Sequence, residues 1–482
     1  MNQLKSATLE MLVEKLYARI NYEGKNRPRP GDFKLANMQR FLKELGDPHL
    51  ACPVIHVAGT KGKGSVSSMI RTILSECQPT GKDRESLRIG SYTSPHLDRI
   101  NQRISVSGQN GCQNISDEDL RRTLLEIWPV VDRFDQAADA STEKKLTFFE
   151  IITTAGFVFF ANQKLDAVVL EVGMGGRLDS TNVCQPILTV ITSISFDHTK
   201  QLGSTLDLIA REKAGIAKPG VPLISGVSKV EPATAIHEIA AKNSSPVFEL
   251  GRDFEFEKKA DRFSVKVNLP DGPKSFENLK SNLAGTHQIN NASVAVAACA
   301  VLNALHDGDI EGEHLAWKVP PEAIVNGLSK VTLPGRAELI AERPAILLDI
   351  AHNPASMEAL AETLKNYIPA FTNDKKRHLV FAASREKDVA NMLAPILPLF
   401  DEIWLTKYIE NPRSMPLDQL CQVAKKFSGD VDNDVNIAEN PRETWAQIES
   451  TLSADDFVCI CGSAFLVAEL RPTLMSWVAN NR

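Results

Sequence analysis

The chain has 482 residues, of which 43% are hydrophobic and 24% are charged, and its formal net charge is −6 at pH 7. This composition is typical of a globular protein with two or three packed domains, of which we expect two, and it argues against a disordered or fibrous chain. The charges are spread along the sequence without the basic block that nucleic-acid binding requires.

Residues 1–20 mix charged with apolar side chains, which argues against the apolar centre of a signal peptide. No apolar run elsewhere looks long and uncharged enough to span a bilayer. We therefore expect a cytoplasmic protein, monomeric, with neither a membrane nor a nucleic acid as its partner.

The first half of the chain predicts a parallel sheet. From Pro53 to about Gly220, short β-branched runs alternate with helical segments, which is typical of strand–helix–strand units. The central strands are expected at residues 54–58, 167–170 and 187–194. The loops after them should gather at one edge of the sheet, where ligands bind in such folds.

The first of these loops has the features of a phosphate loop. Glycines 59, 62 and 64 flank Lys61 and Lys63, and Ser65 follows at the start of a helical pattern. In such a loop the backbone N–H groups face an anion, Lys63 reaches the outer phosphates and Ser65 can ligate magnesium. An ordinary glycine-rich turn is the alternative, but the lysine, the serine and the strand–loop–helix order together favour nucleotide binding.

Polar side chains also follow the next two strands. Glu171 ends the second strand, and Ser65, Glu171 and phosphate oxygens could share one Mg²⁺, whose preferred ligands are oxygens. A glutamate that caps a loop is the alternative. For His198, after the third strand, a structural and a functional role both stay open, because imidazole is an unusual magnesium ligand. Lys213 should lie on a helix that begins with a capping box of Ser204 and Asp207.

The pattern changes in the middle of the chain. Alternating apolar residues between Phe254 and Leu269 predict an antiparallel patch, and residues 283–304 predict an alanine-rich helix. Residues 78–87 should form a surface loop. We place the domain boundary near Thr332, which divides residues 1–331 from residues 332–482.

The C-terminal part predicts a second, smaller α/β domain. Strands are expected at residues 345–350, 379–383, 403–406 and 458–461, with helical segments such as residues 357–364 between them. Cys459 and Cys461 are the only close pair among eight cysteines. Their apolar surroundings favour a buried strand over a metal site.

Several motifs, in a shared order over most of the chain, resemble the folylpolyglutamate synthase branch of the Mur ligase superfamily. The resemblance implies an α/β fold: a Mur ligase-like P-loop ATPase domain with a central, mainly parallel sheet, then a smaller Rossmann-like domain. Residues 1–331 would bind ATP and folate, and residues 332–482 would form the glutamate-ligase domain. The motifs are the phosphate loop GTKGKGS, Thr93-Ser94-Pro95-His96-Leu97, the run from Glu171 to Asn182, His287-Gln288-Ile289-Asn290-Asn291, Pro334-Gly335-Arg336, Asp349-Ile350-Ala351-His352-Asn353-Pro354 and Gly462-Ser463.

The resemblance also implies roles for individual residues. Catalysis would use Lys63, His198, Lys213 and Arg336, with Lys213 modified to N6-carboxylysine. Two Mg²⁺ ions would be expected, with Ser65, Glu171 and His198 as ligands. The folate would contact Thr93, Ser94, Pro95 and His96. ATP would contact Gly59, Thr60, Lys61, Gly62, Lys63, Gly64, Ser65, Gln288, Asn291, Arg336, Asp349 and His352.

Three assignments keep an alternative. Gln288 and Asn291 could instead cap a helix start. The adjacent Phe148 and Phe149 favour core packing over contact with a substrate ring. Residues 384–388 occupy the place of the family's DKD segment but depart from it, so their glutamate-binding role stays open beside a simple helix start near Asp388.

The activity implied is an ATP-dependent amide ligase that adds L-glutamate to a folate carboxylate through an acyl phosphate. Its substrates would be ATP, L-glutamate and a reduced folate or dihydropteroate. The alternatives are dihydrofolate synthase, or a bifunctional enzyme. A Mur ligase of peptidoglycan synthesis fits the GKGS and TSPHL motifs less well, and a nucleotide-binding scaffold without ligase activity would not require Glu171, His198 and Lys213.

Overall fold

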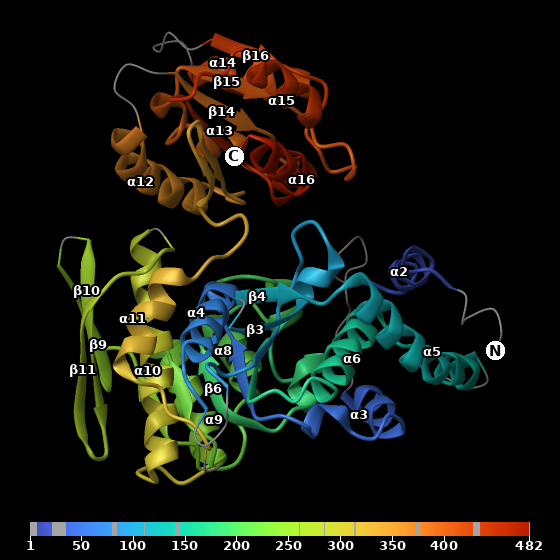
Figure 1. The fold of residues 1–482 in the computed structure, drawn as a ribbon, viewed down its shortest axis with the longest axis vertical. Coiled ribbons are helices and arrows are strands. Elements are labelled where there is room, and N and C mark those ends of the chain that lie inside the picture. The colour runs from blue at the N-terminus through green and yellow to red at the C-terminus, as the bar shows by residue number, and fades with distance from the viewer. Residues whose placement is uncertain are drawn as a thin grey trace. The chain divides into compact units, whose positions relative to one another are not determined.

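The computed structural model describes residues 7–21, 35–79, 84–109, 111–139, 145–259, 261–283, 285–312, 315–371, 376–427 and 434–481. The chain forms two compact units (Figure 1). Unit 1 comprises Met1–His96, Asn101–Asn282 and His287–Val331. Unit 2 comprises Leu97–Ile100, Leu283–Thr286 and Thr332–Arg482.

Unit 1 is built on an eight-stranded sheet in the order β4-β3-β2-β5-β1-β6-β7-β8. The strands from β2 to β8 in that order pair in parallel, and β3 and β4 add an antiparallel edge, which confirms a mainly parallel sheet. The strands are β1 (Val54–Ala58), β2 (Ile89–Tyr92), β3 (Ile104–Gly108), β4 (Gly111–Asn114), β5 (Ala167–Glu171), β6 (Pro186–Ile191), β7 (Leu223–Ser225) and β8 (Val247–Glu249).

The buried strands β1, β5 and β6 lie side by side in the middle of this sheet and explain the continuous apolar runs in the sequence. The prediction of one long strand at residues 187–194 is wrong at its end. Strand β6 stops at Ile191, because residues 192–195 turn away to hydrogen-bond the loop after β1.

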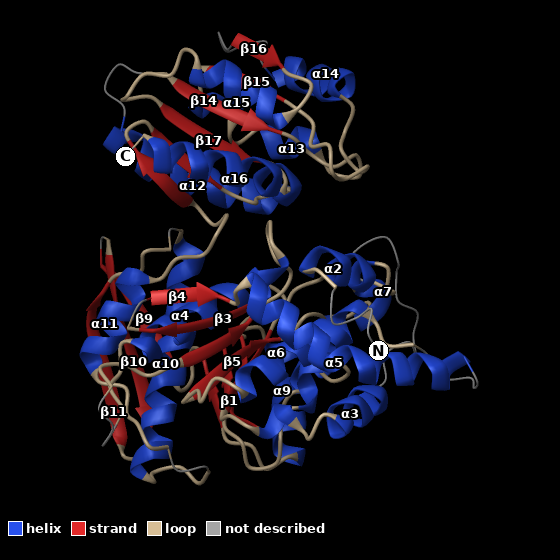
Figure 2. Ribbon diagram, turned by 45° about the vertical axis from the view of Figure 1, so that its right-hand side comes forward, coloured by secondary structure: helices blue, strands red, loops and turns tan. Residues whose placement is uncertain are grey.

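Helices pack around the sheet of unit 1 (Figures 1 and 2). They are α2 (Leu9–Tyr17), α3 (Leu35–Glu44), η1 (Pro48–Leu50), α4 (Lys63–Ser75), η2 (Ile100–Arg103), α5 (Asp117–Asp139), α6 (Phe148–Ala161), η3 (Ser180–Val183), α7 (Thr199–Leu202), α8 (Leu206–Ala214), α9 (Val230–Lys242), α10 (Thr286–Asp307) and α11 (Pro321–Lys330).

The capping box predicted for α8 at Ser204 and Asp207 is wrong. The helix begins one residue later, and the N-cap is Thr205, whose Oγ1 accepts a hydrogen bond from the Leu208 backbone N–H at 3.2 Å. Asp207 instead pairs with Arg211 one turn along the helix, at 2.9 Å.

The antiparallel patch is confirmed as a separate three-stranded sheet. Strands β9 (Phe254–Lys259), β10 (Arg262–Leu269) and β11 (Gly272–Leu279) pair in the order β11-β10-β9. Every second residue of β10 is buried, as its apolar alternation predicts.

Helix α10 is long and apolar enough to cross a membrane by length and composition, so the expectation that no such run exists is wrong. However, 72% of its apolar window is buried inside the protein. It has the burial of a core helix.

Unit 2 has a six-stranded sheet in the order β12-β13-β17-β14-β15-β16, parallel except for the pair β12–β13. Its strands are β12 (Glu338–Glu342), β13 (Ala345–Leu348), β14 (Arg377–Phe381), β15 (Glu402–Leu405), β16 (Asp434–Ile437) and β17 (Phe457–Cys461). Its helices are α12 (Pro354–Phe371), α13 (Val389–Leu393), η4 (Leu397–Leu399), α14 (Leu417–Phe427), α15 (Pro441–Glu449) and α16 (Ala464–Asn480).

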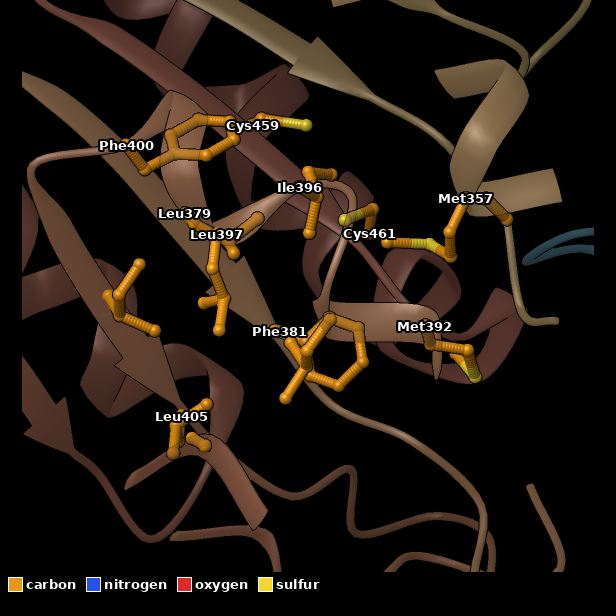
Figure 3. Close-up of a cluster of buried hydrophobic side chains, with 14 of the residues drawn as sticks. Met357, Leu379, Phe381, Met392, Ile396, Leu397, Phe400, Leu405, Cys459 and Cys461 are labelled. Atoms are coloured by element: carbon orange, nitrogen blue, oxygen red, sulfur yellow. The ribbon is translucent and has the colours of Figure 1, made fainter. Parts of the chain in front are cut away.

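Alternate residues of these strands supply two cores, one on each face of the sheet. Phe381, Cys459 and Cys461 belong to the first core (Figure 3), whereas Val380 and Ile460 belong to the second. All of these side chains are fully buried, which confirms the strand interpretation of the two cysteines.

We predict that Phe381→Ala lowers the free energy of unfolding of unit 2 by about 3–5 kcal/mol, because it leaves a cavity in the first core. Denaturant unfolding of the variant would measure the loss. Met475→Ala, at a side chain that is 40% exposed, is the control and should change stability by less than about 0.5 kcal/mol. Equal effects of the two substitutions would contradict the assignment of this core.

Candidate active site

Two positions in the loop after β1 require glycine. Gly59 and Gly62 have φ angles of 149° and 86°. A Cβ on Gly59 would lie 1.9 Å from Oγ1 of Thr192, and one on Gly62 would lie 2.4 Å from Oδ1 of Asn291. The loop therefore packs directly against the segment after β6 and against the start of α10.

The segment after β6 holds this loop through hydrogen bonds. The Thr60 backbone N–H donates to the Ser193 carbonyl at 2.8 Å, and the Thr192 hydroxyl donates to the Lys61 carbonyl at 2.6 Å. The Ser195 backbone N–H in turn donates to the Thr60 hydroxyl at 3.1 Å. These bonds fix the loop conformation at the edge of the sheet where parallel strands end.

Two lysines converge on the carbonyl oxygen of Gly59. Nζ of Lys63, the first residue of α4, lies 3.2 Å from this oxygen, and Nζ of Lys213, on α8, lies 2.8 Å from it. Lys213 is only 4% exposed. Burial, and secondly the positive charge of Lys63, lower the pKa of Lys213 to about 7. A large neutral fraction of this amine is therefore expected near neutral pH.

The strand pairing places Glu171 next to the phosphate loop. Glu171 ends β5 opposite Val57 of β1, two residues before the loop begins, and it is 5% exposed. Ser65, in the first turn of α4, is 6% exposed. A carboxylate and a hydroxyl are hard oxygen donors that suit Mg²⁺. Among the described residues no group of three or more His, Cys, Asp and Glu side chains could hold a metal, so an ion here would also need water or phosphate oxygens.

His198 differs from Ser65 and Glu171 in that its side chain is exposed, whereas theirs are buried. Its side chain is 53% exposed, its φ is 48°, and its backbone N–H donates to Oδ1 of Asp197 at 2.9 Å. It does follow β6, so it lies on the loop beside the phosphate loop.

The loop after Glu171 is held by Asp179, which sequence reasoning missed as a site residue. Its carboxylate accepts hydrogen bonds from the Met174 N–H at 2.9 Å and the Thr181 hydroxyl at 2.6 Å. That hydroxyl also contacts Nε2 of the fully buried His56 at 2.8 Å. Burial raises the pKa of Asp179 despite these bonds. The Asp-Ser-Thr pattern, typical of a side chain that bonds its own backbone, is the signal that could have found it.

Gln288 and Asn291 are brought together at the start of α10. Asn291 Nδ2 donates to Gln288 Oε1 at 2.9 Å, and Gln288 is 3% exposed. Since Asn291 also touches Gly62, both amides lie at the phosphate loop. They do not simply cap the helix.

The predicted folate loop is tied to the N-terminal helix through His96. Arg103, fully buried, donates from Nε to His96 Nδ1 at 2.8 Å, and the Tyr17 hydroxyl lies 3.0 Å from His96 Nε2. Because arginine can only donate, Nδ1 must be unprotonated. Burial, followed by the charge of Arg103, lowers the His96 pKa to about 3. Ser94 in the same loop is 9% exposed, and its Oγ has no hydrogen-bond partner among the described residues.

Phe148 belongs to the core, as expected, whereas Phe149 is half-buried. The Phe148 ring stacks on Tyr17 at 5.4 Å, and the Arg103 guanidinium lies 5.1 Å from its centroid.

In unit 2, Arg336, Asp349 and His352 gather where β13 ends. Asp349 accepts hydrogen bonds from the backbone N–H groups of Ala337 and Ala351 at 2.8 and 2.7 Å. Burial raises the pKa of Asp349, and the nearby charge of Arg336 opposes the rise. His352 Nδ1 lies 3.0 Å from the Ile350 carbonyl oxygen.

The segment at residues 384–388 contains the helix start that sequence reasoning left open. Asp388 is the N-cap of α13, and its carboxylate accepts a hydrogen bond from Asn391. Ser384 and Arg385 instead contact the loop after β15.

Two domain families match the sequence: residues 123–299 match the Mur ligase middle domain, and residues 335–464 match the Mur ligase glutamate ligase domain. A dihydrofolate synthase/folylpolyglutamate synthase from Bacillus subtilis is 34% identical over 453 residues, which cover 92% of this chain and 95% of that protein. A folylpolyglutamate synthase from Thermotoga maritima has a similar crystal structure, with a TM-score of 0.78, 30% identity and 97% coverage of both chains. A bifunctional folylpolyglutamate synthase/dihydrofolate synthase from Yersinia pestis, complexed with AMPPNP and a Mn ion, gives a TM-score of 0.72 at 26% identity and covers 97% of this chain and 98% of that chain.

We predict that Gly62→Ala abolishes measurable ATP binding in calorimetry, because the new methyl group would collide with Asn291 and distort the loop. Gly220→Ala is the matched control. Gly220 also has a positive φ, 72°, but a Cβ there would meet nothing within 4 Å, so ATP affinity should stay unchanged. Equal ATP affinities for the two variants would contradict the loop geometry.

Proposed function

We infer that this chain, which belongs to the dihydrofolate synthase/folylpolyglutamate synthase family, is an ATP-dependent ligase that joins L-glutamate to a folate-type carboxylate. Its relatives cover nearly the whole chain, and they include a structure with AMPPNP and a Mn ion. The observation that carries the proposal is the phosphate loop, with Glu171, Lys213 and Asn291 placed around it.

The reaction follows from the substrates. An oxygen of the acceptor carboxylate attacks the γ-phosphorus of ATP, the bond to the β-phosphate oxygen breaks, and ADP leaves. The amine nitrogen of glutamate then attacks the acyl carbon, inorganic phosphate leaves, and the amine loses a proton. Lys63 and the N–H groups of the loop would neutralise charge on the phosphate oxygens during the first step.

We propose Ser65, Glu171 and His198 as the residues that hold Mg²⁺. The two oxygen donors fit this ion, and two ions are expected, with phosphate and water completing their ligands. When bound, magnesium would offset negative charge on the transferred phosphoryl group.

Lys213 is proposed to be an N6-carboxylysine. The neutral amine attacks the carbon of CO2 and loses a proton, which gives an anionic carbamate. Burial and the nearby Lys63 favour this change, because both disfavour the ammonium form. The carbamate would place a negative charge beside Lys63.

The remaining assignments rest on the family resemblance and on local geometry. Gln288 and Asn291 would contact the nucleotide from α10, and Thr93, Ser94 and Pro95 would contact the folate. His96 would act by positioning this loop, since both its ring nitrogens have protein partners. From unit 2, Arg336, Asp349 and His352 are proposed to contact ATP. We also propose that the enzyme is a cytoplasmic monomer.

The activity is tested by incubating the protein with ATP, Mg²⁺ and L-glutamate, and with either dihydropteroate or tetrahydrofolate as the acceptor. We expect ADP release to match the formation of a product one glutamate heavier, as measured by mass spectrometry. Product from both acceptors would show a bifunctional enzyme. ADP release without any amide product would contradict the proposal and favour another acceptor.

We predict that Lys63→Ala lowers kcat by about 100- to 1000-fold, because the variant loses a positive charge at the phosphoryl oxygens. Lys242→Ala is the control, since it removes an exposed lysine in the last turn of α9, and its kcat should equal that of the wild type. Near-normal turnover by Lys63→Ala would refute the role of this lysine.

We predict that Lys213 gains the mass of one CO2 in bicarbonate buffer and that this modification increases as the pH rises through about 7, where the amine loses its proton. Native mass spectrometry of the holoenzyme would detect it. Lys213→Ala should lose both the added mass and activity, whereas Lys218→Ala should keep the added mass. An unmodified Lys213 at pH 8 under bicarbonate would contradict the assignment.

A further inference from the structure

The last turn of α8, which carries Lys213, packs directly against the loop between β5 and β6. A Cβ on Gly176 of this loop would lie 2.7 Å from the carbonyl oxygens of both Glu212 and Lys213. From the helix side, a Cβ on Gly215 would lie 2.3 Å from Cβ of Arg177. Both distances are shorter than real Cβ contacts, so the two backbones touch with no side chain between them.

Hydrogen bonds join the same two segments. The Arg177 backbone N–H donates to the Glu212 carbonyl at 2.8 Å, and the Arg177 guanidinium pairs with the Glu212 carboxylate at 2.7 Å. Asn182, further along the loop, donates from Nδ2 to the carbonyl oxygens of Arg177 and Gly215, at 3.0 Å each. Gly215 is the C-cap of α8. A single side chain therefore binds both the loop and the end of the helix.

The Asn182 side chain acts as a donor. It is 5% exposed, and its Oδ1 has no hydrogen-bond partner among the described residues. Carbonyl oxygens can only accept, so the amide nitrogen must face Arg177 and Gly215. The last carbonyl groups of a helix have no partner within the helix and need such donors. The hydrogen bonds of this amide thus serve to hold the end of α8 on the loop.

The same loop is anchored to β1, the strand that leads into the phosphate loop. The Thr181 hydroxyl donates to Asp179 at 2.6 Å and lies 2.8 Å from Nε2 of His56, a fully buried residue of β1. Lys213 is therefore connected to the phosphate loop by two routes. Its Nζ bonds the Gly59 carbonyl at 2.8 Å, and its backbone is held through the loop between β5 and β6.

We propose that Asn182 is a positioning residue for Lys213, and that by holding the end of α8 it lowers the CO2 concentration at which the Lys213 carbamate forms. The proposal rests on the proposed function, in which Lys213 is carboxylated. In that step Nζ forms a bond to the carbon of CO2, an electron pair of one C=O bond moves to its oxygen, and Nζ gives a proton to solvent.

Position matters because this step is reversible. Nζ of Lys63 lies 3.2 Å from the same Gly59 carbonyl, so a carbamate fixed at that place has a cation beside it. A lysine whose backbone is free to shift must be ordered each time the carbamate forms, and this ordering costs free energy. More CO2 is then needed to reach the same modified fraction.

The test is a bicarbonate titration of the full-length protein and of Asn182→Ala at pH 8, beginning in CO2-free buffer. Native mass spectrometry measures the fraction that carries the mass of one CO2, and kcat is measured in parallel. Asn182→Ala should need roughly 5- to 100-fold more bicarbonate for half-maximal modification, as expected when two neutral hydrogen bonds are lost. Its kcat should follow the modified fraction, so that saturating bicarbonate restores turnover.

A second variant and a matched control accompany it. Gly176→Ala keeps the Asn182 amide, but its methyl group would push the loop away from Lys213, so its titration should shift in the same direction. Asn243 likewise donates from Nδ2 to a helix carbonyl, that of Ile239 at 2.9 Å, at the end of α9, which packs against α8. The bicarbonate titration of Asn243→Ala should equal that of the wild type.

The outcomes separate this proposal from the proposed function. Equal titrations for the wild type and Asn182→Ala would overturn the positioning role, and so would a loss of kcat that saturating bicarbonate does not restore. Denaturant unfolding identifies a variant that fails to fold, in which case the titration of Gly176→Ala decides. A wild type without added mass at any bicarbonate concentration would overturn the proposed carboxylation itself.

Discussion

The conformation of the phosphate loop in unit 1 depends on Gly59. Its α-carbon packs against Thr192, where a side chain could not fit, and its carbonyl oxygen accepts hydrogen bonds from Lys63 and Lys213. Strand β1, the segment after β6 and helices α4 and α8 therefore meet at one residue. A larger residue here would separate the phosphate loop from both the strand edge and the second lysine.

Two ammonium groups that share one buried carbonyl create an electrostatic imbalance. Burial disfavours the charged form of Lys213, and the positive charge of Lys63 repels it. Both effects lower the pKa of Lys213 and favour its neutral amine. Conversion to a carbamate would replace the repulsion between Lys213 and Lys63 with attraction. The same packing that forms the loop thus favours the chemistry proposed for it.

Local patterns in the sequence predicted much of the fold. Strand β1 matched its predicted range, and β13, β14, β15 and β17 differed by one or two residues at their ends, because short apolar runs between turn signals mark buried strands. The end of β6 was missed, since Thr192 and Ile194 are β-branched and extend the strand pattern, while hydrogen bonds of Thr192 and Ser193 go to the loop after β1. The N-cap of α8 was misplaced by one residue, because Ser204 and Thr205 are equally able to cap.

Side-chain contacts in the candidate site that depend on tertiary packing could not be predicted from the sequence. The order of motifs predicts site roles for Lys63, Glu171 and Lys213, but it gives no sign that Lys213 would bond the Gly59 carbonyl. The contact of His96 with Tyr17 does not follow from local pattern, because the two residues lie 79 positions apart in sequence. Likewise, the contact between residues 384–385 and 413–414 exists only because β14 and β15 are neighbours.

The central claim is that strand pairing places a divalent-metal site between α4 and the end of β5, at the phosphate loop. Anomalous X-ray diffraction from crystals of the protein with Mn²⁺ and a non-hydrolysable ATP analogue tests it most directly. The account predicts an anomalous peak between the Ser65 hydroxyl and the Glu171 carboxylate, in contact with the nucleotide phosphates. A bound nucleotide with Ser65 and Glu171 far apart, and no ion between them, would contradict it.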